Sequence, residues 1–191
     1  MREAVIVSAA RTPIGKAYRG AYNNTAAPTL ASYSIKEAVS RAGIDPEEVE
    51  DVVMGCAQQQ GSQALNIGRL GGIAAGLPNT VPGMTIDRQC SSGLMAIATA
   101  SKQIVTDNMD VVVAGGVESI SLVQTAEMRL DIDPIVTAHA KHAYMPMIET
   151  ADHVADKYEV SREKQDEYSL PVSYTHLTLP DDTPCVDLGG R

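Results

Sequence analysis

The chain has 191 residues, 44% of them hydrophobic, which is enough for one domain with a buried core and no disulfide framework. Its formal net charge of −9 argues against a dedicated nucleic-acid surface, and most of that charge lies late in the chain: residues 1–120 contribute −2 and residues 121–191 contribute −7. Phe and Trp are absent, so the core has to be built from smaller side chains packed closely.

Signals for export or membrane insertion are missing from the sequence. The opening MREAVIVSAARTP lacks the apolar stretch of a signal peptide, and no later stretch is apolar for long enough to span a bilayer. Cys56, Cys90 and Cys185 show no metal-type spacing such as C-x-x-C. We therefore expect reduced thiols in a cytoplasmic chain with no membrane partner, no nucleic-acid partner and no metal.

The first 116 residues alternate strand-like apolar runs with segments of helical spacing. Strands are predicted at residues 5–9, 52–54, 84–87 and 110–114, helices at 28–42, 66–75 and 93–106, and a short helical turn after the N-cap Asp45. The strands are continuous apolar runs, which favours a sheet covered on both faces. The order β-α-β-α-β-α-β then implies mostly parallel strands with right-handed crossovers, an α/β fold.

The character of the sequence changes after Gly116. Residues 117–147 have no clear period, and two helical segments follow at about residues 148–157 and 162–170, the second capped by Ser161. This acidic region is predicted to be a separate helical insertion. Pro171 opens the last 21 residues and is expected to end the preceding helix at Leu170.

The sharpest chemical feature is Asp87-Arg88-Gln89-Cys90-Ser91-Ser92-Gly93, where a short strand turns quickly into a helix. A thiol at a helix start lies near unsatisfied backbone N–H groups and the positive end of the helix dipole, which favours the thiolate. Small neighbours leave room for an acyl group, and backbone donors can hold an oxyanion. Spacing alone leaves open the alternative that Cys90 is a small buried residue in a tight turn.

From residue 3 to about residue 170 the chain resembles a thiolase, a member of the family of acetyl-CoA acyltransferases. The resemblance is carried by six motifs that occur in the same order as in that family. They are SAARTPIG (8–15) with YRG (18–20), QALNIGR (63–69) with AGLP (75–78), CSSGL (90–94), VAGGVESIS (113–121), MIETAD (147–152) and SREKQD (161–166). The chain departs from the family pattern at three positions: Asp87 stands where Asn is commonest, Ile148 replaces Gly and Asp152 replaces Glu.

The resemblance implies a two-step acyl transfer that uses coenzyme A as co-substrate and no permanently bound cofactor. The Cys90 thiolate would cleave a 3-ketoacyl-CoA, release acetyl-CoA and keep the acyl group, which coenzyme A then takes; in reverse, two acetyl-CoA condense. The backbone N–H of Cys90 would donate to the oxyanion, and Met147 matches a position that lines the pantetheine channel. Acyl-CoA and coenzyme A are thus the implied ligands, and the parent protein would be a homodimer or homotetramer.

Three further groups of the family's active site do not occur in this sequence: the His of a G-H-P motif, the Cys of C-x-G-x-G and the Asn of N-E-A-F. The resemblance implies that they belong to a second half. We therefore expect residues 1–120 to be a thiolase-like N-terminal α/β core, 121–170 part of a helical loop domain, and 171–191 a non-native tail. The alternatives are a ketosynthase-type condensing enzyme, or a noncatalytic fragment or binding subunit.

Other candidate sites are weaker. His139, His142 and His153 with Asp152 have a spacing that metal ligands can show, but the first pair lies where no period is clear. Gly115-Gly116 lacks the spacing of a phosphate-binding loop, so a turn is predicted there. Three arginines are candidate anion contacts, although ion pairs at the surface or the edge of the core are the expected default: Arg11, Arg19 and Arg69.

Overall fold

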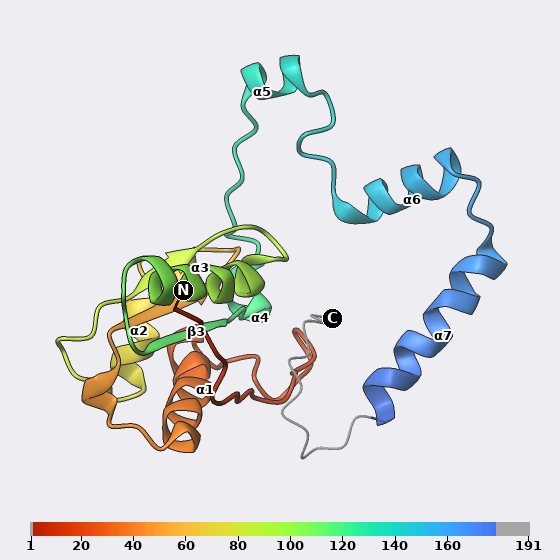
Figure 1. The fold of residues 1–191 in the computed structure, drawn as a ribbon. Helices are drawn as coiled ribbons and strands as arrows, with labels where there is room; N and C mark the ends of the chain where they lie inside the picture. The colour runs from red at the N-terminus through yellow and green to blue at the C-terminus, as the bar shows by residue number, and fades with distance from the viewer. Residues whose placement is uncertain (1, 179–191) are drawn as a thin grey trace. The chain divides into compact units, whose positions relative to one another are not determined.

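The computed structural model describes residues 2–178, with side chains as far as Pro171 (Figure 1). These residues fall into two compact units, the first ending at Met128 and the second beginning at Arg129, and each is described by itself. The division into residues 1–120, 121–170 and 171–191 stays a prediction.

The first unit is built on a three-stranded parallel sheet. Its strands are β1 (Asp51–Gly55), β2 (Met84–Ile86) and β3 (Val112–Gly116), in the spatial order β2-β1-β3. Val53 of the central strand is paired with Met84 on one side and with Ala114 on the other. All five residues of β1 are buried, as a continuous apolar run in a covered strand predicts.

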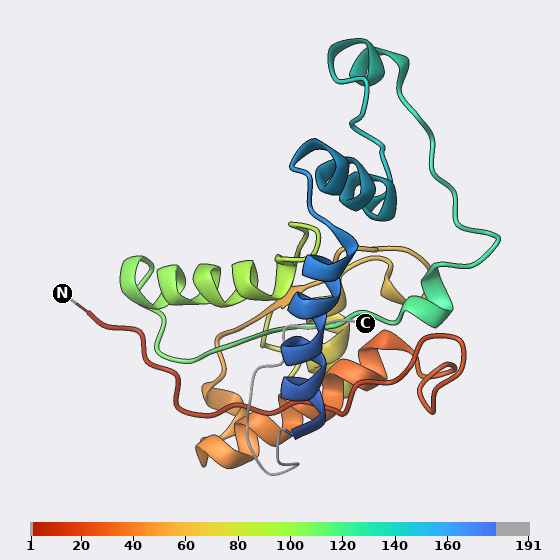
Figure 2. The same cartoon turned by 90° about the vertical axis from the view of Figure 1, so that its right-hand side faces the viewer.

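Three helices cover the two faces of this sheet: α1 (Ala27–Ala42), α2 (Ile67–Ala74) and α3 (Ser92–Thr106). Figure 2 shows α3 on one face, with α2 and α1 on the other. The connection β1-α2-β2 moves to one side of β1 and β2-α3-β3 moves back across it, so right-handed crossovers place the two helices on opposite faces. The predicted parallel sheet covered by helices is therefore confirmed.

The ends of the first helices follow local signals in the sequence. Gly43 ends α1 with a left-handed φ of 67°, which glycine adopts without a steric penalty. Asp45 and Glu48 form a capping box around the 3-10 helix η1 (Pro46–Glu48). Asn66 caps α2 by accepting a hydrogen bond of 3.0 Å from the Arg69 N–H. A second 3-10 helix, η2 (Gly61–Gln63), lies in the loop before α2.

The strand expected at residues 5–9 does not form. Side chains fasten this extended segment instead: the Ser8 hydroxyl donates to the Ala38 carbonyl at 2.7 Å, and the Arg41 guanidinium donates to the Ala9 carbonyl at 3.0 Å. Within residues 2–178 no strand pairs with it, and Ile6 is 79% exposed. An apolar run becomes a strand only where a neighbouring strand accepts its hydrogen bonds, so that part of the prediction was wrong.

The last strand of the sheet also differs in its bounds from the prediction. The fourth predicted strand, at residues 110–114, is displaced to Val112–Gly116, so the expected turn at Gly115-Gly116 is strand instead. The Glu50 carboxylate accepts hydrogen bonds from the backbone N–H groups of Asp110 and Val111, and the Glu50 N–H donates to the Val111 carbonyl at 2.9 Å. The short helix α4 (Ile120–Val123) follows β3.

The second unit contains α5 (Pro134–His139), α6 (Met147–Lys157) and α7 (Arg162–Thr178). Ser161 caps α7 as predicted, accepting from the Lys164 N–H at 3.4 Å. The helix continues through Pro171, so the expected end at Leu170 was wrong: a proline removes one donor and strains a helix without always ending it. No side chain described between residues 129 and 171 is buried, and no described helix is both long and apolar enough to cross a membrane.

Candidate active site

Cys90 lies in the five-residue turn that joins the end of β2 to the start of α3, and it is exposed. The residue before it, Gln89, has a left-handed φ of 49°, an uncommon conformation for a side chain of this size and often found at functional turns. The alternative of a small buried cysteine therefore does not describe this residue. The nucleophilic role of Cys90 stays a prediction.

Side chains of the turn hold its strained shape. The Gln89 N–H donates to the Asp87 carboxylate at 2.8 Å, so the residue that departs from the family pattern still serves as an acceptor. The Ser92 hydroxyl accepts from the Arg88 N–H at 2.8 Å and donates to the Gln89 carbonyl at 2.6 Å. The Ser91 hydroxyl donates to the Arg88 carbonyl at 2.9 Å. Four short bonds thus organise the backbone on both sides of the thiol.

Glycines let the first turn of α3 approach the sheet directly. A Cβ on Gly55, at the end of β1, would lie 2.2 Å from the carbonyl carbon of Ser92. A Cβ on Gly116, at the end of β3, would lie 3.1 Å from the Cα of Gly93. The helix start that follows Cys90 therefore rests on the carboxyl ends of two strands, a position that side chains on these residues would obstruct.

A second hydrogen-bonded cluster, which the sequence did not single out as a site, joins the loops after β1 and β3. The Glu118 carboxylate accepts from the N–H groups of Ala57 and Gln58 at 2.9 and 3.2 Å, and from the side-chain amide of Gln63. Gln63 is fully buried, and its carbonyl oxygen accepts from the Ser119 N–H. Both Gln63 and Glu118 belong to motifs quoted for the family resemblance, and that was the only signal for them in the sequence.

Cys56 is buried beside this cluster. The Gln63 amide donates to its sulfur at 3.2 Å. Burial raises the pKa of the Cys56 thiol to about 12, and the negative charge of Glu118 adds to the rise. Of the two described cysteines, Cys56 is therefore held protonated while Cys90 is exposed.

Asn66 and Arg69 connect α2 to the segment that leads into β2. The Asn66 amide donates to the Gly83 carbonyl at 2.6 Å, and the Thr85 hydroxyl donates to the Asn66 carbonyl oxygen at 3.2 Å. The Arg69 guanidinium donates to the carbonyls of Val81 and Asn79. Neither predicted role of Arg69, an anion contact or an ion pair, describes these bonds, which are to backbone carbonyls.

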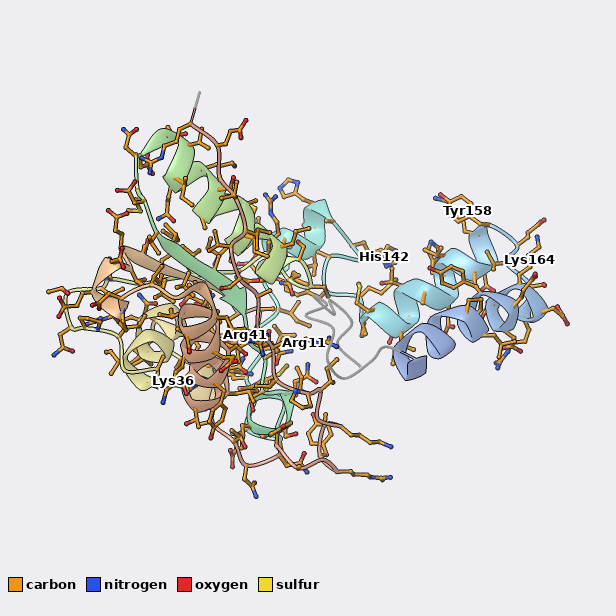
Figure 3. All side chains as sticks on the ribbon, turned by 60° about the horizontal axis from the view of Figure 1, so that its bottom comes forward. Arg11, Lys36, Arg41, His142, Tyr158 and Lys164 are labelled. Carbon is orange, nitrogen blue, oxygen red and sulfur yellow. The ribbon has the colours of Figure 1, made fainter. Side chains whose placement is uncertain are left out.

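Other residues that the sequence suggested as site residues do not belong to the Gln63–Glu118 cluster. Arg11, with Lys36, Tyr22 and Tyr33, lines an open cavity of about 620 Å³ beside α1. Figure 3 labels two of these residues, Arg11 and Lys36. Met147 begins α6 in the second unit and is 70% exposed. Across the described part of the chain, no group of three or more His, Cys, Asp or Glu is arranged to hold a metal ion, and this includes His139, His142 and His153.

Comparison with known proteins places these features in a family. Residues 4–176 match the thiolase N-terminal domain. A 3-ketoacyl-CoA thiolase of Bacillus subtilis is 42% identical over 170 residues, which cover 89% of this chain and 44% of that protein. A beta-ketoadipyl-CoA thiolase of Pseudomonas aeruginosa is 36% identical over 188 residues, covering 88% and 46%.

A solved structure agrees with these sequence matches. The crystal structure of the Bacillus anthracis acetyl-CoA acetyltransferase superposes with a TM-score of 0.73 at 33% identity, covering 99% of this chain and 57% of that one. The chain spans less than half the length of the curated relatives it matches. With its parallel sheet, its Cys90 turn and the match over residues 4–176, the chain belongs to the thiolase family, within the family's N-terminal domain.

Proposed function

We propose that this chain supplies the nucleophile of a thiolase, with Cys90 as the residue that accepts the acyl group. The observation that carries the proposal is the exposed Cys90 thiol, held in a strained turn at the start of α3. Relatives named 3-ketoacyl-CoA thiolase and beta-ketoadipyl-CoA thiolase support an acyl-CoA substrate, and they favour a thiolase over a ketosynthase-type enzyme.

The proposed reaction has two balanced steps. The Cys90 thiolate attacks the 3-keto carbon of a 3-ketoacyl-CoA, and the bond between carbons 2 and 3 breaks. The electron pair of that bond leaves as the acetyl-CoA enolate, which takes a proton to become acetyl-CoA. Coenzyme A, losing its thiol proton, then attacks the thioester on Cys90, so that a shortened acyl-CoA leaves and the thiolate returns. The Cys90 N–H is proposed to hold the oxyanion.

The chain by itself is proposed to be inactive in turnover. Its sequence contains no G-H-P, C-x-G-x-G or N-E-A-F motif, the segments that carry the other reacting groups in the family it resembles. Enzymes of this kind need a base for the thiol and a donor for the leaving enolate. Cys90 is thus expected to be capable of a half-reaction only.

Several finer features belong to the same proposal. Met147 is proposed to contact the pantetheine arm of coenzyme A, which its exposure on α6 permits. Fatty-acid β-oxidation is the proposed setting, and a homodimer or homotetramer the proposed assembly of the parent. The unpaired state of Cys56 and Cys90 supports a reducing, cytoplasmic location.

Transfer of an acyl group to Cys90 tests the proposal directly. After incubation with acetyl-CoA, trypsin separates the three cysteines, because cleavage at Arg41, Arg69, Arg88, Lys102 and Lys164 places each on its own peptide. We expect acetylation on the peptide of residues 89–102, little on 42–69, and none at position 90 in Cys90→Ser. Equal labelling of all three peptides would contradict the assignment.

A thiolysis assay with acetoacetyl-CoA and coenzyme A tests the second part of the proposal. We expect no turnover by the 191-residue chain. Turnover that disappears in Cys90→Ala would show that the nucleophile is correct but that the chain needs no further catalytic groups.

A further inference from the structure

We propose that Glu118 is a positioning residue for Cys90, acting through the backbone of residues 55–57. The inference deepens the proposed function and rests on it, since a position for Cys90 matters only if the thiol reacts. Glu118 follows β3 and Cys90 follows β2. These two parallel strands flank the central strand β1, so both residues lie at the carboxyl end of the sheet, with the end of β1 between them.

Glu118 first of all binds the loop after β1 through hydrogen bonds to its backbone. Its carboxylate oxygens accept from the Ala57 N–H at 2.9 Å and the Gln58 N–H at 3.2 Å. An ionised carboxylate has only acceptors, and bonds from N–H groups to a charged acceptor are stronger than neutral ones. The side chain is exposed overall, so its role is to hold the loop from outside and not to fill the core.

The second step leads from that loop to both ends of the Cys90 turn. The Cys56 N–H donates to the Ile86 carbonyl at 3.0 Å, which holds the last residue of β2 before the turn. Gly55 contacts the backbone of Ser92, the first residue of α3 after the turn. Residues 55–57 therefore lie between the Glu118 carboxylate and the two residues that bracket Cys90.

Gln63 explains how the carboxylate is oriented. The buried Gln63 amide nitrogen donates to Glu118, and also to the Gln58 carbonyl at 2.7 Å, while its oxygen accepts from the Ser119 N–H. The amide thus presents a donor to the acid and an acceptor to the backbone. A carboxylate at position 63 would have no donor for the Gln58 carbonyl, so the amide of Gln63 is required in this arrangement.

The raised pKa of Cys56 argues against a role for this cluster in activating the Cys56 thiol. A carboxylate near a thiol disfavours the thiolate, and here it contributes to the raised pKa of Cys56. The cluster therefore suppresses the reactivity of the cysteine it touches. What remains for Glu118 is to hold the loop that supports the Cys90 turn.

Alkylation of the full chain by iodoacetamide tests the inference, with Cys90 followed on the peptide of residues 89–102 and Cys56 on 42–69. At every pH between 7 and 9 we expect the alkylation rate constant of Cys90 to be about fivefold lower in Glu118→Gln than in the unsubstituted chain. This factor is equivalent to one lost hydrogen bond of about 1 kcal/mol. Glu127→Gln, the same change at another exposed residue of this unit, is the matched control and should leave that rate constant unchanged.

Circular dichroism and urea unfolding are measured on each variant. A purely structural Glu118 would lower the unfolding midpoint and leave the rate constant and pH profile of Cys90 unchanged, and that result overturns the inference. If Glu118→Gln does not fold, Glu118→Asp, which keeps the charge on a shorter arm, is judged by the same criterion.

The two proposals fail in different ways. If acetyl-CoA never labels Cys90 while Glu118→Gln still slows its alkylation, the proposed function is wrong and the structural link between the two residues stands. If Cys90 is acetylated and Glu118→Gln changes neither its alkylation nor its acetylation rate, the proposed function stands and Glu118 has no positioning role.

Discussion

Gly55 and Ser92 are in backbone contact: a Cβ placed on Gly55 would lie 2.2 Å from the carbonyl carbon of Ser92 and 2.4 Å from its oxygen. The end of the central strand and the start of α3 therefore touch without an intervening side chain. This contact determines how close the helix that follows Cys90 lies to the sheet, and it identifies Gly55 as a position where one added methyl group must move the backbone.

Gly55→Ala is expected to lower the free energy of unfolding by about 2 kcal/mol or more, because the new methyl group overlaps backbone atoms that cannot rotate away. Urea denaturation measures it. Gly93→Ala is the matched control: its Cβ would lie 3.7 Å from Gly116, an ordinary contact, and alanine favours the helix, so it should be neutral or slightly stabilising. Equal effects of the two substitutions would contradict this account.

Asn66→Ala is expected to cost about 1–3 kcal/mol of stability. The substitution removes the cap of α2 and leaves the Gly83 carbonyl and the Thr85 hydroxyl without their Asn66 bonds. Thermal unfolding of the variant measures the loss. Asn79→Ala, at an exposed position, should stay within about 0.5 kcal/mol of the unsubstituted chain, and a similar loss there would show that the Asn66 bonds are not the cause.

The ends of helices and the covered central strand could be predicted from the sequence, because each depends on residues close together in the chain. Gly43 and Asp45 show where α1 ends and η1 begins, because a left-handed φ and a side-chain cap need only neighbouring residues. The apolar run of β1 showed a covered strand. The turn between strand and helix around Cys90 was also predicted, since a strand, a few small residues and a helix in quick succession can be recognised from sequence alone.

Long-range partners explain what the sequence did not show. The apolar run at residues 5–9 has the composition of a strand, and whether it forms one depends on a neighbour elsewhere in the chain. Just before β3, the N–H groups of Asp110 and Val111 donate to the Glu50 carboxylate, about 60 positions away, a contact that no local pattern indicates. The contacts of Glu118 with Ala57 and Gln58 are equally remote in sequence, so no periodicity indicated them.

The raised pKa of Cys56 predicts a loss of stability in alkali. In the unfolded chain an ordinary thiol titrates near pH 9, whereas the folded chain keeps the Cys56 proton up to about pH 12. Between these values the unfolded state binds fewer protons, so stability falls as the pH rises, and it is unaffected by this group below about pH 8. At pH 10 the loss is about 1 kcal/mol. Urea midpoints at pH 7 and 10 measure it, and Cys56→Ser, which does not titrate, should show a smaller fall.

Cys90 and Cys56 are expected to differ by at least about 1000-fold in their rate of alkylation by iodoacetamide at pH 8. A thiol with a pKa of about 12 is a thiolate in only about one molecule in ten thousand at that pH, and Cys56 is also buried. Cys90 is exposed, so the reagent reaches it in the folded chain. Peptide mass spectrometry of residues 42–69 and 89–102 follows both in one sample.

Urea provides the control for that difference. Because Cys56 reacts only after local or global opening, its rate should rise steeply through the unfolding transition and meet that of an ordinary thiol beyond it. The rate of Cys90 should change far less over the same range. Rapid alkylation of Cys56 in the absence of urea would mean that the loop held by Gln63 and Glu118 opens easily, and the contacts by which Glu118 supports the Cys90 turn would then be too transient to position it.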